Sequence, residues 1–169
     1  NKLIMETKLN FSKNNKEAFL KTITLAYKKA PFYPNCYPIL ENIILNDEDD
    51  LTQYIKYSFD KTNEYLGITT ELLLSSKIPT DESLKGKDKI ISICKKLGAT
   101  QYINAIGGQE LYSKEDFIKN GIQLNFIKMN DIKYKQFNDK FVPNLSIIDI
   151  MMFNSPEEIR KMLDEYTLI

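Results

Sequence analysis

Residues 102–128 read YINAIGGQELYSKEDFIKNGIQLNFIK, and this stretch decides the fold of the chain. A β-branched and aromatic run is followed by two adjacent glycines, a helix-like segment and a second apolar run. We predict a strand over 101–106, a helix over 113–121 with Ser113 as its cap, and a strand over 122–128. Strands that alternate with short helices are typical of right-handed crossovers in a parallel sheet.

The sequence before this stretch extends the pattern. The apolar run ITTELLL predicts a further parallel strand over 68–74, and the segment after it predicts a helix over 85–98 that ends at Gly98. Apolar residues at helical spacing predict three more helices nearer the N-terminus. These predicted helices cover residues 16–30, 39–45 and 48–67.

Less regular segments complete the prediction. The prolines of FYPNCYP at 32–38 predict a bend, and the weak alternation of LIMETKL at 3–9 predicts an edge strand. Residues 130–144 are polar and without a period, which predicts a long loop that leads to a helix start at Asn144. The tail, 145–169, predicts two helices broken at Asn154-Ser155.

Together these segments predict an α/β fold in a single domain over residues 1–169. We expect a small, mainly parallel sheet with helices on both faces and extra helices at the N- and C-terminal ends. The chain has 169 residues, of which 43% are hydrophobic and 27% charged, as expected for a globular protein. Lys+Arg and Asp+Glu are equal at 23 each, which argues against a nucleic-acid partner, since such proteins carry a basic surplus.

The absences in the composition restrict the chemistry. The chain has no histidine, which excludes Ser-His-Asp and Cys-His catalysis and any His-ligated metal site within it. Its only arginine is Arg160, and it contains neither a P-loop nor a GxGxxG motif, so no metal and no cofactor are expected. Two cysteines and no apolar run of membrane-spanning length predict a cytoplasmic protein without a membrane span.

The Gly107-Gly108 pair lies where the predicted strand over 101–106 ends. Ser75-Ser76 lies at the end of the strand predicted over 68–74, and ligands of open parallel sheets bind at such carboxyl ends. Backbone N–H groups in a Gly-Gly loop can receive an anion or a carbonyl oxygen. The alternative, which the spacing leaves open, is that Gly107 supplies a positive φ in a turn and Ser75 caps a helix.

Carboxylates and tyrosines supply the remaining candidates. Glu110 follows the glycines and is a candidate general base, and the alternative is that it forms a cap or an ion pair at the surface. Asp149 lies on an otherwise apolar helix face, so it orients a site group or closes a helix terminus. The candidate catalytic residues are Glu110 and Asp149. The candidate substrate-binding residues are Ser75, Ser76, Tyr102, Asn104, Gly107, Gly108, Tyr112 and Tyr134.

Three stretches together resemble one known family. The stretches are LGITTELLLSSKI at 66–78, YINAIGGQELY at 102–112, and YKQF with FVPNLSIID within 134–149. The family that they resemble is that of the WbqC-like proteins of bacterial surface-polysaccharide gene clusters. The resemblance covers most of the chain. Family members usually begin with a further strand-containing segment, so we expect this chain to correspond to the C-terminal two thirds of the family pattern.

The resemblance implies a function for which the residues alone give no direct sign. It implies a cytoplasmic enzyme of O-antigen-type precursor synthesis that transfers an acyl or aminoacyl group to a nucleotide-linked amino sugar. The alternative is a non-catalytic domain that binds a carbohydrate or a partner enzyme, which the absence of histidine keeps open. The expected partners are a nucleotide-sugar or another small substrate, and a second copy of the chain in a homodimer, because a missing first strand leaves a sheet edge unpaired.

Overall fold

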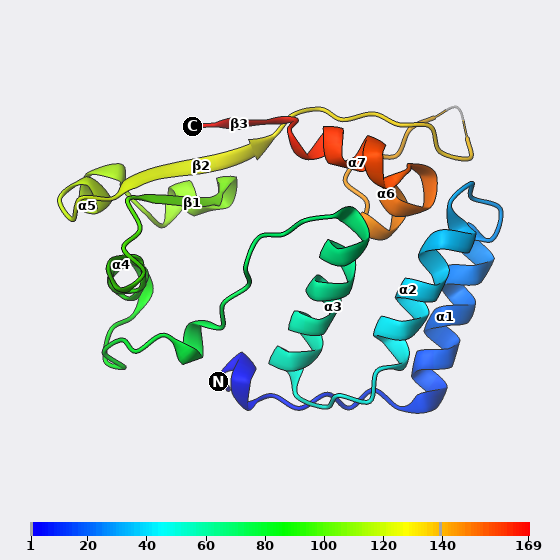
Figure 1. The fold of residues 1–169 in the computed structure, drawn as a ribbon, viewed down its shortest axis with the longest axis horizontal. Helices are drawn as coiled ribbons and strands as arrows, with labels where there is room; N and C mark the ends of the chain where they lie inside the picture. The colour runs from blue at the N-terminus through cyan, green and yellow to red at the C-terminus, as the bar shows by residue number, and fades with distance from the viewer. Residues whose placement is uncertain (1, 139) are drawn as a thin grey trace. The chain divides into compact units, whose positions relative to one another are not determined.

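The computed structural model describes residues 2–138 and 140–169. The chain forms two compact units, drawn in Figure 1. Unit 1 takes in Asn1–Glu71 and Lys133–Asp164, and unit 2 takes in Leu72–Ile132 and Glu165–Ile169. That residues 1–169 act as one domain stays a prediction.

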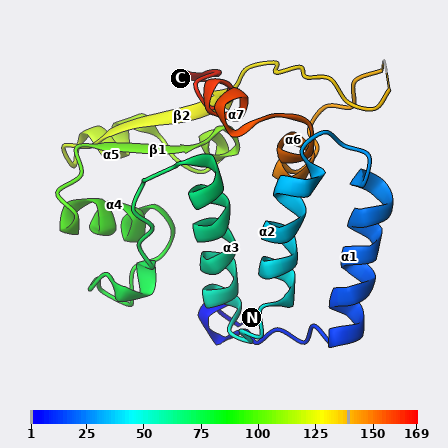
Figure 2. The same cartoon turned by 45° about the vertical axis from the view of Figure 1, so that its right-hand side comes forward.

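Unit 1 is built from helices. Figures 1 and 2 show α1, α2 and α3 side by side, and α6 packs on α2 while α7 packs on α3. The bounds of these helices are Lys13–Tyr27 for α1, Tyr33–Leu45 for α2, Leu51–Leu66 for α3, Ile147–Phe153 for α6 and Pro156–Leu163 for α7. Side chains of Ser12, Asp50, Ser146 and Ser155 accept a backbone N–H at four of the helix starts, which satisfies donors that the first turn leaves free.

The core of unit 1 lies between these helices. Its most deeply buried side chains share an apolar character and come from α2, α3, α6 and α7. They are Cys36, Leu66, Met151, Met152 and Ile159. Burial of such side chains is the main stabilising term of a helical unit, at about 1.5–3 kcal/mol for each large apolar residue.

Three predictions for unit 1 are wrong in detail. The expected bend at 32–38 is the first half of α2, because Pro34 occupies the first turn, where its missing N–H has no partner in the helix. The expected edge strand at 3–9 is a short 3-10 helix, η1 (Ile4–Glu6), with an isolated bridge from Lys8 to Asp50. The helix expected to start at Asn144 starts at Ile147, since Ser146 provides the cap.

Unit 2 contains the sheet. The parallel pairing of β1 (Gln101–Ala105) with β2 (Gln123–Met129) confirms the prediction for these two strands, and Tyr102 faces Leu124 in their register. A third strand, β3 (Tyr166–Leu168), pairs antiparallel with β2 and makes the order β1-β2-β3. The other elements of unit 2 are η2 (Ser75–Lys77), α4 (Gly86–Lys96), η3 (Ile106–Glu110) and α5 (Lys114–Ile118).

The sheet differs from the prediction in two respects. The prediction of a strand over 68–74 is wrong, because these residues form no strand. No neighbouring strand packs against their apolar side chains, and Leu73 is 52% exposed. The sheet is therefore mixed, and its third strand comes from the C-terminal segment that was expected to be helical. In the described part of unit 2, buried residues of α4 and α5 pack with one face of the sheet, while Ile103 on the other face is 45% exposed.

No helix within residues 2–138 and 140–169 has the length and apolar character needed to cross a lipid bilayer.

Candidate functional site

The two adjacent glycines lie in η3, directly after β1, and they differ in their surroundings. Neither has a positive φ, so the turn alternative is wrong in that respect. Gly108 is buried, and a Cβ added to it would lie 2.6 Å from Asn104 Nδ2 and 3.3 Å from Phe126 Cε1. A Cβ added to Gly107 would meet nothing within 4 Å. The close approach that requires glycine at 108 is therefore an approach to the sheet of the same unit.

The side chains of this region mostly serve the core of unit 2. The Tyr102 ring is stacked on Phe117 with centroids 5.5 Å apart, and the Tyr112 ring meets the edge of Phe117 at 5.9 Å. Burial raises the pKa of Tyr102, with smaller contributions from Tyr112 and Cys94. Asn104 Oδ1 accepts the backbone N–H of Ala105 at 2.7 Å, which holds the amide beside Gly108.

Four predicted site residues of unit 2 are exposed, namely Gly107, Glu110, Ser75 and Ser76. Glu110 lies at the end of η3, and Ser75 and Ser76 begin η2. Figures 1 and 2 show the segment before α4, which contains η2, well away from the carboxyl end of β1. The structure therefore leaves the Ser75-Ser76 pair apart from the glycine loop, since the strand that was to carry it to the sheet edge is not formed.

Asp149 is the centre of a hydrogen-bonded cluster in unit 1. Its side chain lies in the first turn of α6 and the residue is 3% exposed. Asp149 Oδ1 accepts the Tyr27 hydroxyl at 3.0 Å, and Oδ2 accepts the Tyr134 hydroxyl at 2.6 Å and Gln136 Nε2 at 2.8 Å. A buried carboxylate needs such partners, and the positive end of the helix adds to them.

The same cluster fastens the long loop before α6. The Gln136 side chain forms two hydrogen bonds with the backbone of Val142. Gln136 Oε1 accepts the Val142 N–H at 2.9 Å, and Gln136 Nε2 donates to the Val142 carbonyl at 3.2 Å. The Tyr134 ring meets the edge of Phe141 at 5.2 Å. Residue 139 lies outside the described residues. The prediction of a loop is confirmed for the described residues 130–138 and 140–144, and Tyr134 and Gln136 contact Asp149 within unit 1.

The phenol pKa values of the two tyrosines in the cluster are raised. Burial, and then the hydrogen bond to Asp149, raises the pKa of Tyr27 from its ordinary value of 10.0 to about 12. The same two causes, in the same order, raise the pKa of Tyr134. Both phenols are therefore donors at neutral pH, and Asp149 accepts from three donors at once. The hydrogen bonds hold Tyr27, Tyr134 and Gln136 around Asp149. A catalytic role for Asp149 stays a prediction.

The predicted residues thus fall into separate groups. Asp149 and Tyr134 are in contact in unit 1, whereas Asn104 with Gly108 and Tyr102 with Tyr112 are in contact in unit 2. The prediction that brought Ser75-Ser76 to the same sheet edge as Gly107-Gly108 depended on a strand over 68–74, which is not formed.

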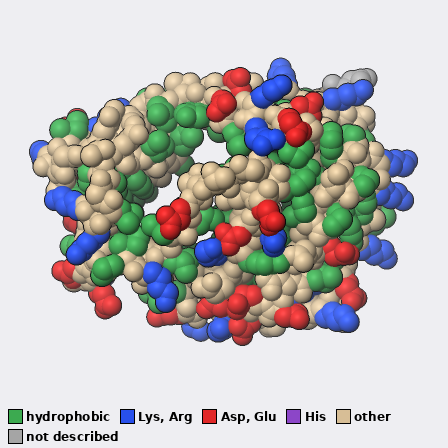
Figure 3. Space-filling view, viewed as in Figure 1, with side chains coloured by type: hydrophobic (Ala, Val, Ile, Leu, Met, Phe, Trp, Pro, Cys, Tyr) green, Lys and Arg blue, Asp and Glu red, His purple; other side chains and the backbone are tan. Residues whose placement is uncertain are grey.

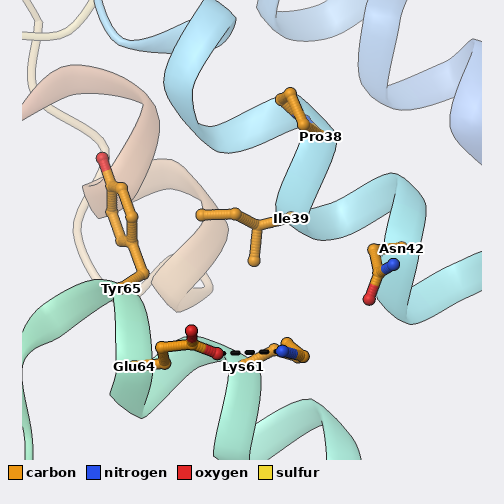
Figure 4. A pocket seen from close by; sticks show the side chains of 6 residues that line it. All are labelled: Pro38, Ile39, Asn42, Lys61, Glu64 and Tyr65. Atoms are coloured by element: carbon orange, nitrogen blue, oxygen red, sulfur yellow. Dashed lines mark hydrogen bonds and ion pairs between the residues drawn. The ribbon is translucent and has the colours of Figure 1, made fainter.

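The hollowed surface of unit 1 lies between α2 and α3, and the sequence analysis missed it. Three adjoining hollows of about 420, 530 and 370 Å³ follow this groove, and neighbouring hollows share Asn42, Asn46 and Tyr57. Figure 4 shows the first hollow, with Pro38, Ile39 and Asn42 on α2 facing Lys61, Glu64 and Tyr65 on α3. All three hollows are open to solvent, so a ligand bound there would stay partly exposed.

A regular spacing in the sequence marks this groove. Gln53, Tyr57, Lys61 and Tyr65 recur every four residues along α3, which places polar and aromatic side chains on one helix face. The Tyr57 hydroxyl donates to Asn42 Oδ1 and links the two helices across the groove. Such a stripe of mixed tyrosine, amide and charge differs from the purely apolar stripe that a core-facing helix shows.

The charges along the groove are mostly acidic. Lys56 and Lys61 line it, and each is bound to an acid of the same helix, Asp60 at 2.7 Å and Glu64 at 2.9 Å. On the face drawn in Figure 3, basic and acidic side chains are interspersed.

The comparisons with known proteins give one match. Searches of curated proteins and of solved structures found nothing similar to the chain. A family comparison matches residues 1–161 to the WbqC-like protein family, which covers the glycine loop of unit 2, the groove between α2 and α3 and the Asp149 cluster. The chain belongs to the WbqC-like protein family.

Proposed function

We propose that this protein helps to make the precursors of a bacterial surface polysaccharide, as a transferase that places an acyl or aminoacyl group on a nucleotide-linked amino sugar. The observation that carries the proposal is membership in the WbqC-like family over residues 1–161. The residue inventory is compatible with it, because carboxylates, amides and tyrosines bind sugar hydroxyl and amine groups.

In the proposed reaction, Glu110 is the general base. It is exposed at the end of η3, which follows the carboxyl end of β1, where parallel sheets bind ligands. The sugar amine attacks the acyl carbonyl, the nitrogen–carbon bond forms, and the bond from the carbonyl to the leaving group of the activated donor breaks. Glu110 accepts the amine proton, and the leaving group departs with the electron pair.

The test combines binding with turnover. Calorimetric titration with UDP-, GDP- and dTDP-linked amino sugars is expected to find one that binds, with the bare nucleoside diphosphates binding more weakly. A product heavier by one acyl group, detected by mass spectrometry with acyl thioesters as donors, would establish the transfer. We expect Glu110→Gln to spare binding and to lower turnover about 100-fold or more, in line with the usual contribution of a general base.

Glu115→Gln is the matched control, because Glu115 is also an exposed glutamate of unit 2 and lies in the first turn of α5. Equal turnover of the two variants would remove Glu110 from the mechanism. Absence of binding by every nucleotide-sugar would overturn the proposal as a whole.

A non-catalytic carbohydrate-binding role is the second candidate. It is favoured by the full hydrogen bonding of Asp149, whose two oxygens already accept three donors, and by the packing of Tyr102 and Tyr112 in the core of unit 2. In that case a sugar ligand would bind and no donor would be consumed under any condition of the turnover assay.

A further inference from the structure

We propose that the groove between α2 and α3 binds an amino sugar with a free amine, through its middle hollow. This inference goes beyond the proposed function, which places the transfer at Glu110 in unit 2, and only the choice of a carbohydrate rests on that function. The preference for an amine rests on the residues of the hollow alone.

The middle hollow, of about 530 Å³, has acids and no lysine or arginine among its lining residues. Glu41 and Asp47 are its charged side chains. Glu41 is half-buried and forms no ion pair with any residue that the structure describes, whereas Asp47 is exposed and lies 3.7 Å from Lys16 Nζ. Lys16 Nζ itself is turned to the carbonyl of Asn46, at 2.5 Å. An ammonium group placed beside Glu41 therefore meets one carboxylate that no described cation neutralises.

The rest of the hollow suits a sugar ring. Pro38, Leu45 and Tyr57 offer apolar surface, and Leu45 is 42% exposed, so this surface is open to a ligand. Asn42 offers amide donors beside it, since its Oδ1 already accepts the Tyr57 hydroxyl while its Nδ2 is left for a ligand. Apolar surface next to amide and carboxylate groups is the pairing that a sugar, with its C–H face and its hydroxyl rim, can satisfy.

Two other ligand classes fit the hollow poorly. A phosphate or diphosphate group needs cations or free backbone N–H groups, and the lysines of the adjoining hollows are bound to Asp60 and Glu64. A divalent metal needs several ligands at one point, and the described residues contain no group of three acids, cysteines or histidines that could hold one.

The experiment follows backbone amide signals of the full chain by NMR during titration with glucosamine. Shifts are expected for residues of α2 and α3 that line the middle hollow. N-acetylglucosamine, which has no charge, and glucosamine 6-phosphate, which adds negative charge, are expected to bind at least about threefold more weakly. High salt is expected to weaken glucosamine binding, since it screens the attraction between the ammonium and Glu41.

Glu41→Gln is the test variant, and Glu17→Gln on the exposed part of α1 is its matched control. Removing the Glu41 charge is expected to weaken glucosamine binding about threefold to tenfold, the effect of losing one charge-assisted hydrogen bond, and Glu17→Gln is expected to leave it unchanged. Equal effects of the two variants, tighter binding of the phosphate derivative, or stronger binding of spermidine than of glucosamine would overturn the inference.

The outcome separates this inference from the proposed function. Nucleotide-sugar binding with no glucosamine shifts in the groove would reject the groove and keep the function. Glucosamine shifts in the groove, with no nucleotide-sugar binding, would reject the transferase and keep the groove.

Discussion

Gly108 shows how a single hydrogen atom in place of a methyl group shapes unit 2. The space beside its Cα is filled by the Asn104 amide, which the Ala105 N–H holds in place, and by the Phe126 ring from β2. The neighbouring Gly107 faces open space. The close approach at Gly108 is to Asn104 and Phe126 of the sheet, and contact of the glycine loop with a ligand stays a prediction.

Replacing Gly108 with alanine is expected to destabilise the protein by about 1–3 kcal/mol, because Asn104 and Phe126 must move to admit the Cβ. Gly107→Ala is the matched control and should change the free energy of unfolding by no more than about 0.5 kcal/mol. Urea unfolding followed by circular dichroism measures both. A stable Gly108→Ala protein would show that η3 is not fixed against the sheet.

The hydrogen bond between Tyr27 and Asp149 leads to a prediction about tyrosine titration. Because the folded-state pKa of Tyr27, about 12, lies above its ordinary value of 10.0, this tyrosine adds stability that is complete below pH 10 and is lost as the pH rises toward 12. Asp149→Asn removes the carboxylate that contributes to this rise. We expect the late part of the tyrosine titration, followed by ultraviolet absorbance, to move to lower pH in this variant.

The exposed Asp164, at the C-terminal end of α7, provides the control. Asp164→Asn should leave the tyrosine titration as it is. If Asp149→Asn behaves in the same way, then burial alone keeps the two phenols protonated.

Pro38 is the clearest case at the scale of an element. Two prolines in FYPNCYP predict a bend, yet α2 runs from Tyr33 to Leu45 through both of them. Pro34 lies in the first turn, where a proline costs little, whereas Pro38 lies inside the helix and removes one backbone hydrogen bond. Packing of Cys36, Leu40 and Ile44 into the core outweighs that loss.

Pro38→Ala is therefore expected to stabilise the protein by about 1–3 kcal/mol, since it restores an N–H donor inside the helix. Pro34→Ala should have a much smaller effect, because the first turn has no partner for that N–H. Thermal unfolding of the two variants beside the parent measures the difference. A lower melting temperature for Pro38→Ala would mean that the ring packs in the groove more strongly than the missing bond costs.

Long periodic elements were predictable from the sequence, and elements held by distant contacts were not. The helix from Leu51 to Leu66 has an acidic cap, an apolar stripe and a glycine stop, so local residues determine it. The three residues of β3 carry no such pattern and become a strand only because β2 offers them an edge. For the same reason the partners of Asp149 were not predictable, because Tyr27 and Tyr134 come from segments far apart in the chain.

At the scale of the whole molecule, the outer edge of β1 has no partner strand among the described residues. Unpaired edges invite pairing with another chain, and Ile103 on the open face of the sheet adds exposed apolar surface. We expect a homodimer at micromolar concentration in analytical ultracentrifugation. Ile103→Lys should shift it toward monomer, because a charge on an edge strand opposes pairing.

Ile118→Lys serves as the control for this prediction, since Ile118 is 65% exposed and belongs to α5, not to β1. A protein that stays monomeric at high concentration, or one in which both substitutions act alike, would show that the β1 edge is not the contact.

The path of the chain through its two units has a consequence for synthesis on the ribosome. Proteins of several units usually complete them in the order in which they emerge, starting from the N-terminus. Here α1, α2 and α3 leave the ribosome first, but Met151, Met152 and Ile159, which fill their core, emerge only after all of β1 and β2. For most of translation, therefore, apolar side chains of α2 and α3 such as Leu40 and Leu66 lack the residues that they pack against in the folded protein. During that interval they are open to chaperones, and a ribosome that stalls between the two halves of unit 1 would hold a chain that cannot close its first core.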